Sequence, residues 1–294
     1  MYNEISANKR KTWFLVFLTS AIIVLISLVF GLAYNVDAPS AIGAGLIFSG
    51  GYSLISYYIS DKIALGANGA KEIQKSDSPE LWNVIENLCI ANGQPMPRVY
   101  VIDDPSPNAF ATGRDPKHAS IAYTTGILAL LNKQEIEGVT AHELSHVKNY
   151  DIRVMTIVVV LVGSILLLSD VFLRGGTFRR RDGKNDGGNI FMIIGIILAI
   201  LSPLFAELLK LAVSRSREYL ADASGALLTR YPEGLASALE KLRDNATPMT
   251  HANKATAHLF IQNPFGDAGK KLNTLFSTHP PIEERIKRLR TMGD

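Results

Sequence analysis

The feature that most constrains this chain is a stretch of 22 residues without a charged side chain, from Trp13 to Tyr34. An α-helix rises about 1.5 Å per residue, so a helix of this length crosses a hydrocarbon core of roughly 30 Å. Basic residues at positions 9–11 precede the stretch, as they do in a signal peptide. The apolar stretch is too long for a signal peptide, however, and no small-residue cleavage site is evident. We therefore expect a retained membrane anchor.

A second uncharged stretch, Ala38 to Ser60, predicts a second membrane helix. Four of its glycines are small enough to let the first helix approach closely, namely Gly43, Gly45, Gly50 and Gly51. The connection between the two stretches has no Lys or Arg, whereas the flanking segments do. The positive-inside rule then places the N-terminus in the cytoplasm and returns the chain there near Lys62. We expect a multi-pass protein of the cell membrane whose soluble part faces the cytoplasm.

Two later hydrophobic stretches, Val154 to Leu173 and Ile190 to Val213, approach the length of a membrane span. Charged residues interrupt both, namely Asp170, Glu207 and Lys210. If both stretches span, the basic loop from Arg174 to Lys184 faces outside, which goes against the positive-inside rule. The alternative is a hydrophobic hairpin that dips into the bilayer or packs on the soluble domain. We favour two spans, which makes about four hydrophobic helices in all, and the alternative stays open.

The rest of the chain predicts an α+β fold, mainly helical with a small β-sheet. We expect a two-span anchor over residues 1–60, a soluble block over 61–151, the hydrophobic hairpin over 152–213 and a second soluble block over 214–294. A formal net charge of only +3 does not point to nucleic acid as a partner. The single cysteine, Cys89, excludes an internal disulfide framework and is interpreted as a small core residue.

Local patterns predict individual elements of the soluble blocks. A helix should begin at Ser78-Pro79-Glu80 and end at Gly93, with its apolar residues at helical spacing. Three short strands are expected over residues 98–102, 108–113 and 119–124. In the second block, two apolar stripes predict the core faces of helices: Leu235, Leu239 and Leu242, then Ile282, Ile286 and Leu289. The basic stretch from Arg285 to Arg290 is interpreted as a solvated helix face.

The strongest chemical signal is His142-Glu-Leu-Ser-His146, which follows a segment compatible with continuous helix. Residues four apart on a helix share a face, so both imidazoles can reach one metal ion. Glu143 is offset by about 100 degrees, since a helix has 3.6 residues per turn. That offset keeps Glu143 out of the ligand set and next to it, where a base for metal-bound water is needed. The motif therefore predicts zinc-dependent hydrolysis.

A catalytic zinc site needs three protein ligands and an open position for water. The segment from Ser214 to Gly225 contains Glu218 and Asp222, which are four apart and share a helical face. Glu218 can serve as the third ligand, while Asp222 can accept the free ring N–H of a bound histidine. The competing interpretation is a solvated acidic face beside Arg215 and Arg217, because surface ion pairs are common.

One topological requirement is met. Ligands at 142, 146 and 218 must lie on the same side of the membrane, and an even number of hydrophobic stretches separates them. The chemistry expected is attack of an activated water on a peptide carbonyl, with Glu143 carrying the proton to the leaving amine. No convincing Ser or Cys nucleophile arrangement is present in the sequence, which agrees with a mechanism without a covalent intermediate.

Along nearly its whole length the chain resembles the HtpX-type membrane metalloproteases, relatives of the CAAX prenyl endopeptidases. The matching segments are Asn108-Ala-Phe-Ala-Thr-Gly113, His142 to His146, Ser-Arg-Glu-Tyr-Leu-Ala-Asp222, Ala257 to Phe265 and Thr278 to Ile286. Five matches in order are far more specific than the zinc motif alone. They favour Glu218 as the third ligand of one Zn²⁺ per chain.

The resemblance implies a gluzincin-like domain with an edge strand that pairs with an extended substrate backbone. The residues of that strand are Asn108, Ala109, Phe110, Ala111, Thr112 and Gly113. The resemblance also implies degradation of misfolded or damaged membrane proteins at the cytoplasmic face. His279 lies in a matching segment, and it is expected either to stabilise the oxyanion or to pack the cleft. His118, His251 and His258 have no partner at ligand spacing, so surface or packing roles are expected.

Two other classes of function fit the sequence less well. A membrane scaffold or chaperone with a structural zinc site would normally use four protein ligands, usually cysteines. The chain has no pair of cysteines, which counts against that class. A transporter would carry its ionisable residues inside the membrane spans. Here the His and Glu cluster lies just outside the hydrophobic stretches, which counts against a transporter.

Overall fold

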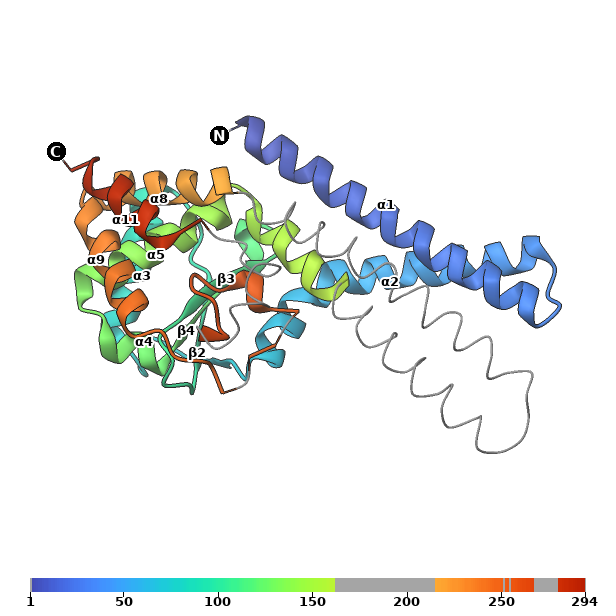
Figure 1. Cartoon of the computed structure of the whole chain (residues 1–294), viewed down its shortest axis with the longest axis horizontal. Coiled ribbons are helices and arrows are strands. Elements are labelled where there is room, and N and C mark those ends of the chain that lie inside the picture. Colours follow the sequence, from blue (N-terminus) through green and yellow to red (C-terminus); the bar gives the residue numbers. More distant parts are fainter. Residues whose placement is uncertain (1, 162–214, 251, 254, 267–279, 294) are drawn as a thin grey trace.

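The structure is a computed structural model that describes residues 2–161, 215–250, 252–253, 255–266 and 280–293 (Figure 1). Two long helices, α1 (Tyr2–Ala33) and α2 (Ala38–Ala67), lie side by side and extend away from a globular part that holds the sheet and the shorter helices. Both are long and apolar enough to cross a membrane, by length and composition. Only 11% of the most apolar window of α1 and 17% of that of α2 is buried, so their side chains do not form a soluble core.

The turn between the two helices has a simple local explanation. Asn35 adopts a left-handed backbone conformation with φ 57°. Asp37 caps α2 by accepting a hydrogen bond from the backbone N–H of Ser40. Of the four glycines predicted to allow a close approach, only Gly45 does so, because a Cβ there would lie 2.9 Å from the Cα of Val24. A Cβ at Gly43, Gly50 or Gly51 would meet nothing within 4 Å, so for these the prediction was wrong.

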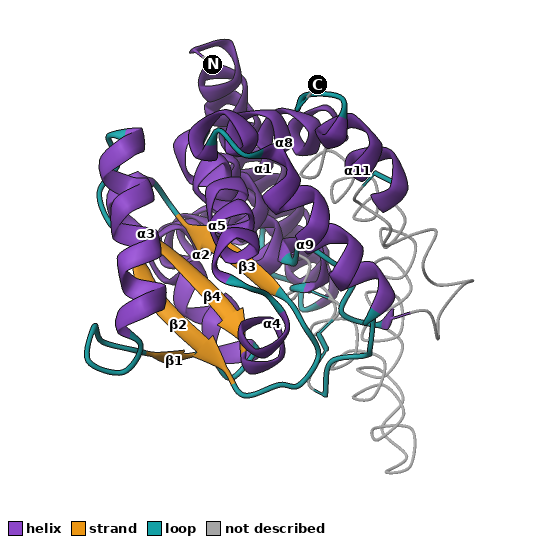
Figure 2. Ribbon diagram, turned by 90° about the vertical axis from the view of Figure 1, so that its left-hand side faces the viewer, coloured by secondary structure: helices purple, strands orange, loops and turns teal. Residues whose placement is uncertain are grey.

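The four strands form one sheet in the order β1-β2-β4-β3 (Figure 2). They are β1 (Lys71–Glu72), β2 (Arg98–Ile102), β3 (Ala109–Gly113) and β4 (Ala119–Thr124). The parallel pair is β2 with β4, and the other two pairs are antiparallel. A short 3₁₀ helix (Pro116–His118) connects β3 to β4. Strand β3 pairs only with β4, so it lies at the edge of the sheet. The three strands expected from the sequence are confirmed, and β1 was not foreseen.

Helices surround this sheet. They are α3 (Pro79–Asn92), α4 (Thr125–Leu130), α5 (Lys133–Lys148), α8 (Arg215–Thr229), α9 (Pro232–Asp244) and α11 (Ile282–Arg290), with a 3₁₀ turn at Ala257–Leu259. The predicted α3 is confirmed, with Pro79 at its start and Gly93 in the left-handed conformation at its end. The apolar stripes of α3, α9 and α11 pack in one core, which also holds Cys89. The mixed α+β class expected from the sequence is therefore confirmed.

Helix α5 lies at the centre of these contacts, and its first turn is well specified. Asn132 and Glu135 form a reciprocal capping box in which each side chain bonds the other residue's backbone N–H. Helix α9 crosses α5 so closely that a Cβ at Gly138 would lie 2.6 Å from the backbone nitrogen of Leu235. Only glycine fits this crossing without a backbone shift.

The third hydrophobic stretch is described only in part. Residues 151–161 are helical, and every residue from Val154 to Leu161 is buried inside the protein. They pack with Leu15 of α1 and Ala64 of α2 in a second apolar core. The rest of that stretch, the basic loop Arg174–Lys184 and the stretch Ile190–Val213 lie outside the described residues. The number of about four hydrophobic helices is thus not confirmed, and the domain boundaries stay predictions.

Candidate metal centre

The structure brings the three predicted ligands together. His142 and His146 project from one face of α5 with their Nε2 atoms 3.2 Å apart. The carboxylate of Glu218, on α8, lies 3.8 Å from Nε2 of His142 and 3.5 Å from Nε2 of His146. One ligand atom from each residue lies within 4.8 Å of the others, and all three residues are buried. The alternative of a solvated acidic face is wrong for Glu218, which is 1% exposed.

This donor set matches the requirements of zinc. Two imidazole nitrogens and one carboxylate oxygen are the ligands that catalytic zinc sites use, with the fourth position left for water or substrate. Among the described residues, no other group of three His, Cys, Asp or Glu side chains has this arrangement. The site can therefore hold one divalent ion.

Glu143 lies beside this cluster and is 2% exposed. Burial raises the pKa of its carboxyl group, and the nearby Glu218 acts in the same direction. The two histidines and a hydrogen bond with the backbone of Ala111 in β3 act in the opposite direction. The net shift is upward, which makes Glu143 a better proton acceptor than an exposed glutamate. A buried carboxylate with a raised pKa next to a metal cluster is typical of a general base.

Comparison with known proteins decides the family. The sequence model described as Peptidase family M48 matches residues 75–293. A protease HtpX homolog from Dictyoglomus thermophilum is 48% identical over 296 residues, covering 100% of this chain and 95% of that protein.

This chain belongs to peptidase family M48. A protease HtpX homolog from Tropheryma whipplei is also 48% identical, over 100% of this chain and 99% of that protein. Another, from Caldanaerobacter subterraneus subsp. tengcongensis, is 47% identical. The crystal structure of S. mikatae Ste24p matches with a TM-score of 0.50 at 20% identity, covering 98% of this chain and 67% of that one, and it supports the fold. The M48 chain is thus an HtpX-type metalloprotease that hydrolyses peptide bonds.

Asp222 lies in the position that the sequence suggested for a partner of a metal ligand. Its Oδ1 is 2.9 Å from Nδ1 of His142. Arg285 of α11 donates to both oxygens of this carboxylate, from Nε at 2.9 Å and from Nη2 at 2.7 Å. Burial alone would raise the pKa of Asp222, but the guanidinium of Arg285 and the hydrogen bond with His142 outweigh it and lower the pKa to about 2. Asp222 is therefore held as a carboxylate that can orient the ring of His142.

Arg285 was misjudged from the sequence. The basic stretch from Arg285 to Arg290 was interpreted as a solvated face, yet Arg285 is 1% exposed. It lies three residues after Ile282 and four before Leu289, so it belongs to the apolar face of α11. The other basic residues of the stretch, Lys287, Arg288 and Arg290, do face solvent, and Arg290 pairs with exposed Glu233. Helical periodicity was the signal that could have separated Arg285 from its neighbours.

Asp151 was missed altogether. Its Oδ2 lies 3.0 Å from Nδ1 of His146, the same relationship that Asp222 has to His142. The hydrogen bond with Asp151 and the carboxylate of Glu218 raise the pKa of His146 to about 9 although burial acts in the opposite direction. Asp151 follows α5 within one turn, and an acidic residue five positions after His146 was the available signal.

The other histidines do not join the cluster. His118 is exposed and pairs with Asp115, and His258 is buried with its Nε2 3.0 Å from the carbonyl oxygen of Met155. These positions agree with surface and packing roles. His251 and His279 lie outside the described residues, so the expectation for His279 stays a prediction.

The predicted substrate strand is the edge strand β3, but its outer side already has partners. The carbonyl of Ala109 accepts from the backbone N–H of Ile261, and the side chain of Asn108 bonds the backbone of Gln262 in both directions. At the far end, the N–H of Gly113 donates to Oγ1 of Thr156. A substrate backbone that pairs along β3 must therefore displace some of these contacts.

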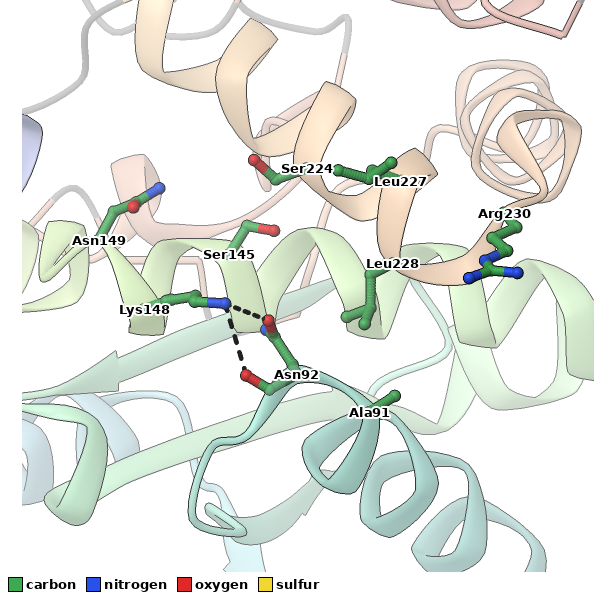
Figure 3. A pocket seen from close by; sticks show the side chains of 9 residues that line it. All are labelled: Ala91, Asn92, Ser145, Lys148, Asn149, Ser224, Leu227, Leu228 and Arg230. Atoms are coloured by element: carbon green, nitrogen blue, oxygen red, sulfur yellow. Dashed lines mark hydrogen bonds between the residues drawn. The ribbon is translucent and has the colours of Figure 1, made fainter. Parts of the chain in front are cut away.

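A separate cavity of about 500 Å³ lies on the flank of α5 (Figure 3). It is lined by α3, α5 and α8, and Lys148 reaches across it to the side chain of Asn92. None of the metal-binding side chains lines this cavity. The cavity is therefore separate from the buried His142, His146 and Glu218 cluster.

Proposed function

We propose that this chain is a membrane-anchored zinc endopeptidase that binds one Zn²⁺ per chain through His142, His146 and Glu218. The observation that carries the proposal is the convergence of these three buried side chains beside the buried Glu143. They come from two helices, since Glu218 follows His146 by 72 positions and His142 by 76. The family assignment supports peptide-bond hydrolysis as the reaction.

The roles of the residues follow from their positions. A bound zinc ion would acidify a coordinated water and polarise the scissile carbonyl. Glu143 accepts the proton of the attacking water and then donates it to the leaving amine. Asp222 and Asp151 each accept the N–H of one histidine ring, so the two rings present Nε2 to the same point. The closely packed Gly225 of α8, whose Cβ would lie 3.1 Å from the nitrogen of His142, keeps Glu218 near both rings.

The substrate class we propose is an unfolded segment of a membrane protein, cleaved at the cytoplasmic face. An extended backbone can add to β3 through main-chain hydrogen bonds, which recognise any sequence. A substrate must displace the 261–262 segment before it can pair with β3, and a flexible substrate segment can do this more readily than a folded one. The outward-facing apolar surfaces of α1 and α2 support attachment to a bilayer. The basic residues before Trp13 support a cytoplasmic N-terminus.

The test uses the full-length protein in detergent or nanodiscs with an unfolded soluble protein and a destabilised membrane protein as substrates. Cleavage should stop with a chelator and return with zinc. Glu143→Gln should keep its zinc, and its rate of cleavage should fall by several orders of magnitude. Glu137→Gln on the same helix should keep both its zinc and its rate of cleavage. Wild-type protein that binds no zinc, or a Glu143→Gln variant that cleaves normally, would contradict the proposal and favour the scaffold alternative.

The orientation has a test of its own. Lys75 is exposed on the globular part, before α3. The variant that carries Lys75→Cys and Cys89→Ser has a single cysteine, at position 75. This cysteine should resist a membrane-impermeant maleimide in intact cells and react after permeabilisation. Labelling in intact cells would place the globular part outside and refute the cytoplasmic assignment.

A further inference from the structure

The beginning of the first membrane helix reaches the metal centre. Asn8 lies on α1, 125 positions before the start of the metal-binding helix α5, yet it is 1% exposed. We propose that Asn8 is a positioning residue of the metal site, through which the membrane anchor holds Asp151 and thereby the ring of His146. This inference rests on the proposed zinc site and adds the anchor to it.

All hydrogen-bonding groups of the Asn8 amide are used. Its Nδ2 donates to the backbone carbonyl of Asn149 at 2.9 Å and to Oδ1 of Asp151 at 2.7 Å. Its Oδ1 accepts from Nη1 of Arg217 at 3.2 Å. Arg217 directly precedes the ligand Glu218 in α8 and also lies 3.5 Å from Oδ1 of Asp151. One amide thus connects the segment after one ligand helix to the first turn of the other.

A neighbouring contact involves the same turn. The ammonium group of Lys9 lies over the ring of Tyr150, 5.1 Å from its centroid. Tyr150 is held in a left-handed backbone conformation with φ 60°. Residues 149, 150 and 151 therefore each contact α1, two through hydrogen bonds from Asn8 and one through the cation–π interaction with Lys9. A turn with an unfavourable backbone conformation needs such contacts to persist.

The geometry shows how Asn8 acts on the ligand. Asp151 uses Oδ2 for His146 and Oδ1 for Asn8, so the amide, together with Arg217, holds the rotation of the carboxylate that faces the ring. The carbonyl of Asn149 lies at the end of α5, where helix carbonyls lack an internal partner, and Asn8 supplies a donor to it. An alanine at position 8 removes both donations. An aspartate keeps the size and the acceptor for Arg217, but it has no donor for Asp151 and places a second negative charge beside it.

The consequence is that α1 is part of the active site and not only a tether. Its apolar length faces outward, while its first turns contact the residues that orient a metal ligand. A change in the position of α1 relative to the globular part would therefore change the affinity for zinc.

The experiment measures zinc affinity of the full-length protein in detergent by competition with a chelator, together with kcat and KM for one peptide. Partners of metal ligands typically change metal affinity or activity by 10- to 100-fold. Asn8 acts through such a partner, so we expect Asn8→Ala and Asn8→Asp to weaken zinc binding by about tenfold. The value of kcat should fall while KM stays within twofold. The matched control is Thr12→Val, one turn later on the same buried face, which should leave both measurements within twofold of the wild type.

A double-mutant cycle separates positioning from packing. If Asn8 acts through Asp151, adding Asn8→Ala to Asp151→Ala should cause no further loss of zinc affinity. Full additivity, or zinc binding by Asn8→Asp within twofold of the wild type, would overturn the inference. If Asn8→Ala does not fold, Asn8→Leu takes its place in the cycle, because it preserves the size of the side chain and removes both donations. Wild-type protein that binds no zinc would overturn the proposed function itself, which distinguishes the two failures.

Discussion

Replacement of Arg285 by leucine tests whether the buried pair between Arg285 and Asp222 supports both the fold and the metal centre. Each of the two residues is at most 2% exposed, and two hydrogen bonds join them. The leucine keeps most of the apolar volume of the arginine stem. It leaves the carboxylate of Asp222 buried next to His142 without its counter-charge. The variant therefore breaks the buried ion pair with Asp222, and it also removes the guanidinium that lies 3.8 Å from the carboxylate of Glu218.

The expected magnitude follows from the charge interaction between the two residues. The pKa of Asp222 falls from an ordinary value of 3.8 to about 2, which corresponds to about 2 kcal/mol in favour of the ionised form. Because the folded-state pKa is below the unfolded one, this contribution is present above about pH 4 and is lost as the pH falls toward 2. Stranding the carboxylate adds its desolvation cost, and breaking such pairs typically costs about 3–5 kcal/mol. For a domain of this size that lowers Tm by roughly 6–20 °C.

The assay is thermal unfolding of the full-length protein in detergent at pH 7, with chelator and with zinc. Arg290→Leu is the matched control because Arg290 lies on the same helix and also bonds two carboxylates, those of Glu233 and Glu240, but is exposed. Its Tm should change far less. The double variant Arg285→Leu with Asp222→Leu should regain much of the stability without regaining activity. Equal and small shifts for Arg285→Leu and Arg290→Leu would refute the reasoning.

Three further outcomes are expected. Gly138→Ala should destabilise the protein by about 1–3 kcal/mol in thermal unfolding because its Cβ would overlap the backbone of α9, whereas Gly66→Ala, which meets nothing within 4 Å, should not. Burial raises the pKa of the Cys89 thiol to about 11, so iodoacetamide at pH 8 should modify it only in denaturant, as mass spectrometry can show. Burial acts to raise the pKa of Glu135, but the hydrogen bond from Lys241 helps to make the net shift downward. Glu135→Gln should therefore lower Tm at pH 7, and the difference from wild type should shrink as the pH falls below about 4.5, the ordinary value.

The sequence alone determined the features that depend on neighbours along the chain. The uninterrupted apolar stretch predicts α1 without any knowledge of its neighbours in the fold, because the length of the stretch matches the thickness of a bilayer. The spacing of His142 and His146 places both rings on one face of any helix that contains them. The alternation and turn residues around 98–124 predict strands for the same local reason. These patterns also carried the family resemblance that favoured Glu218.

Only the tertiary structure decided the partners of the metal-binding histidines. Asp151 contacts His146 across a turn, and Asn8 reaches Asp151 over a separation of 143 residues. Arg285 reaches Asp222 over 63 residues, and that contact buries a side chain that charge alone suggested was solvated. No local period connects positions so far apart in the chain. Their contacts arise when packed helices exclude water, because a charged or amide group that loses water must then find a polar partner in the fold.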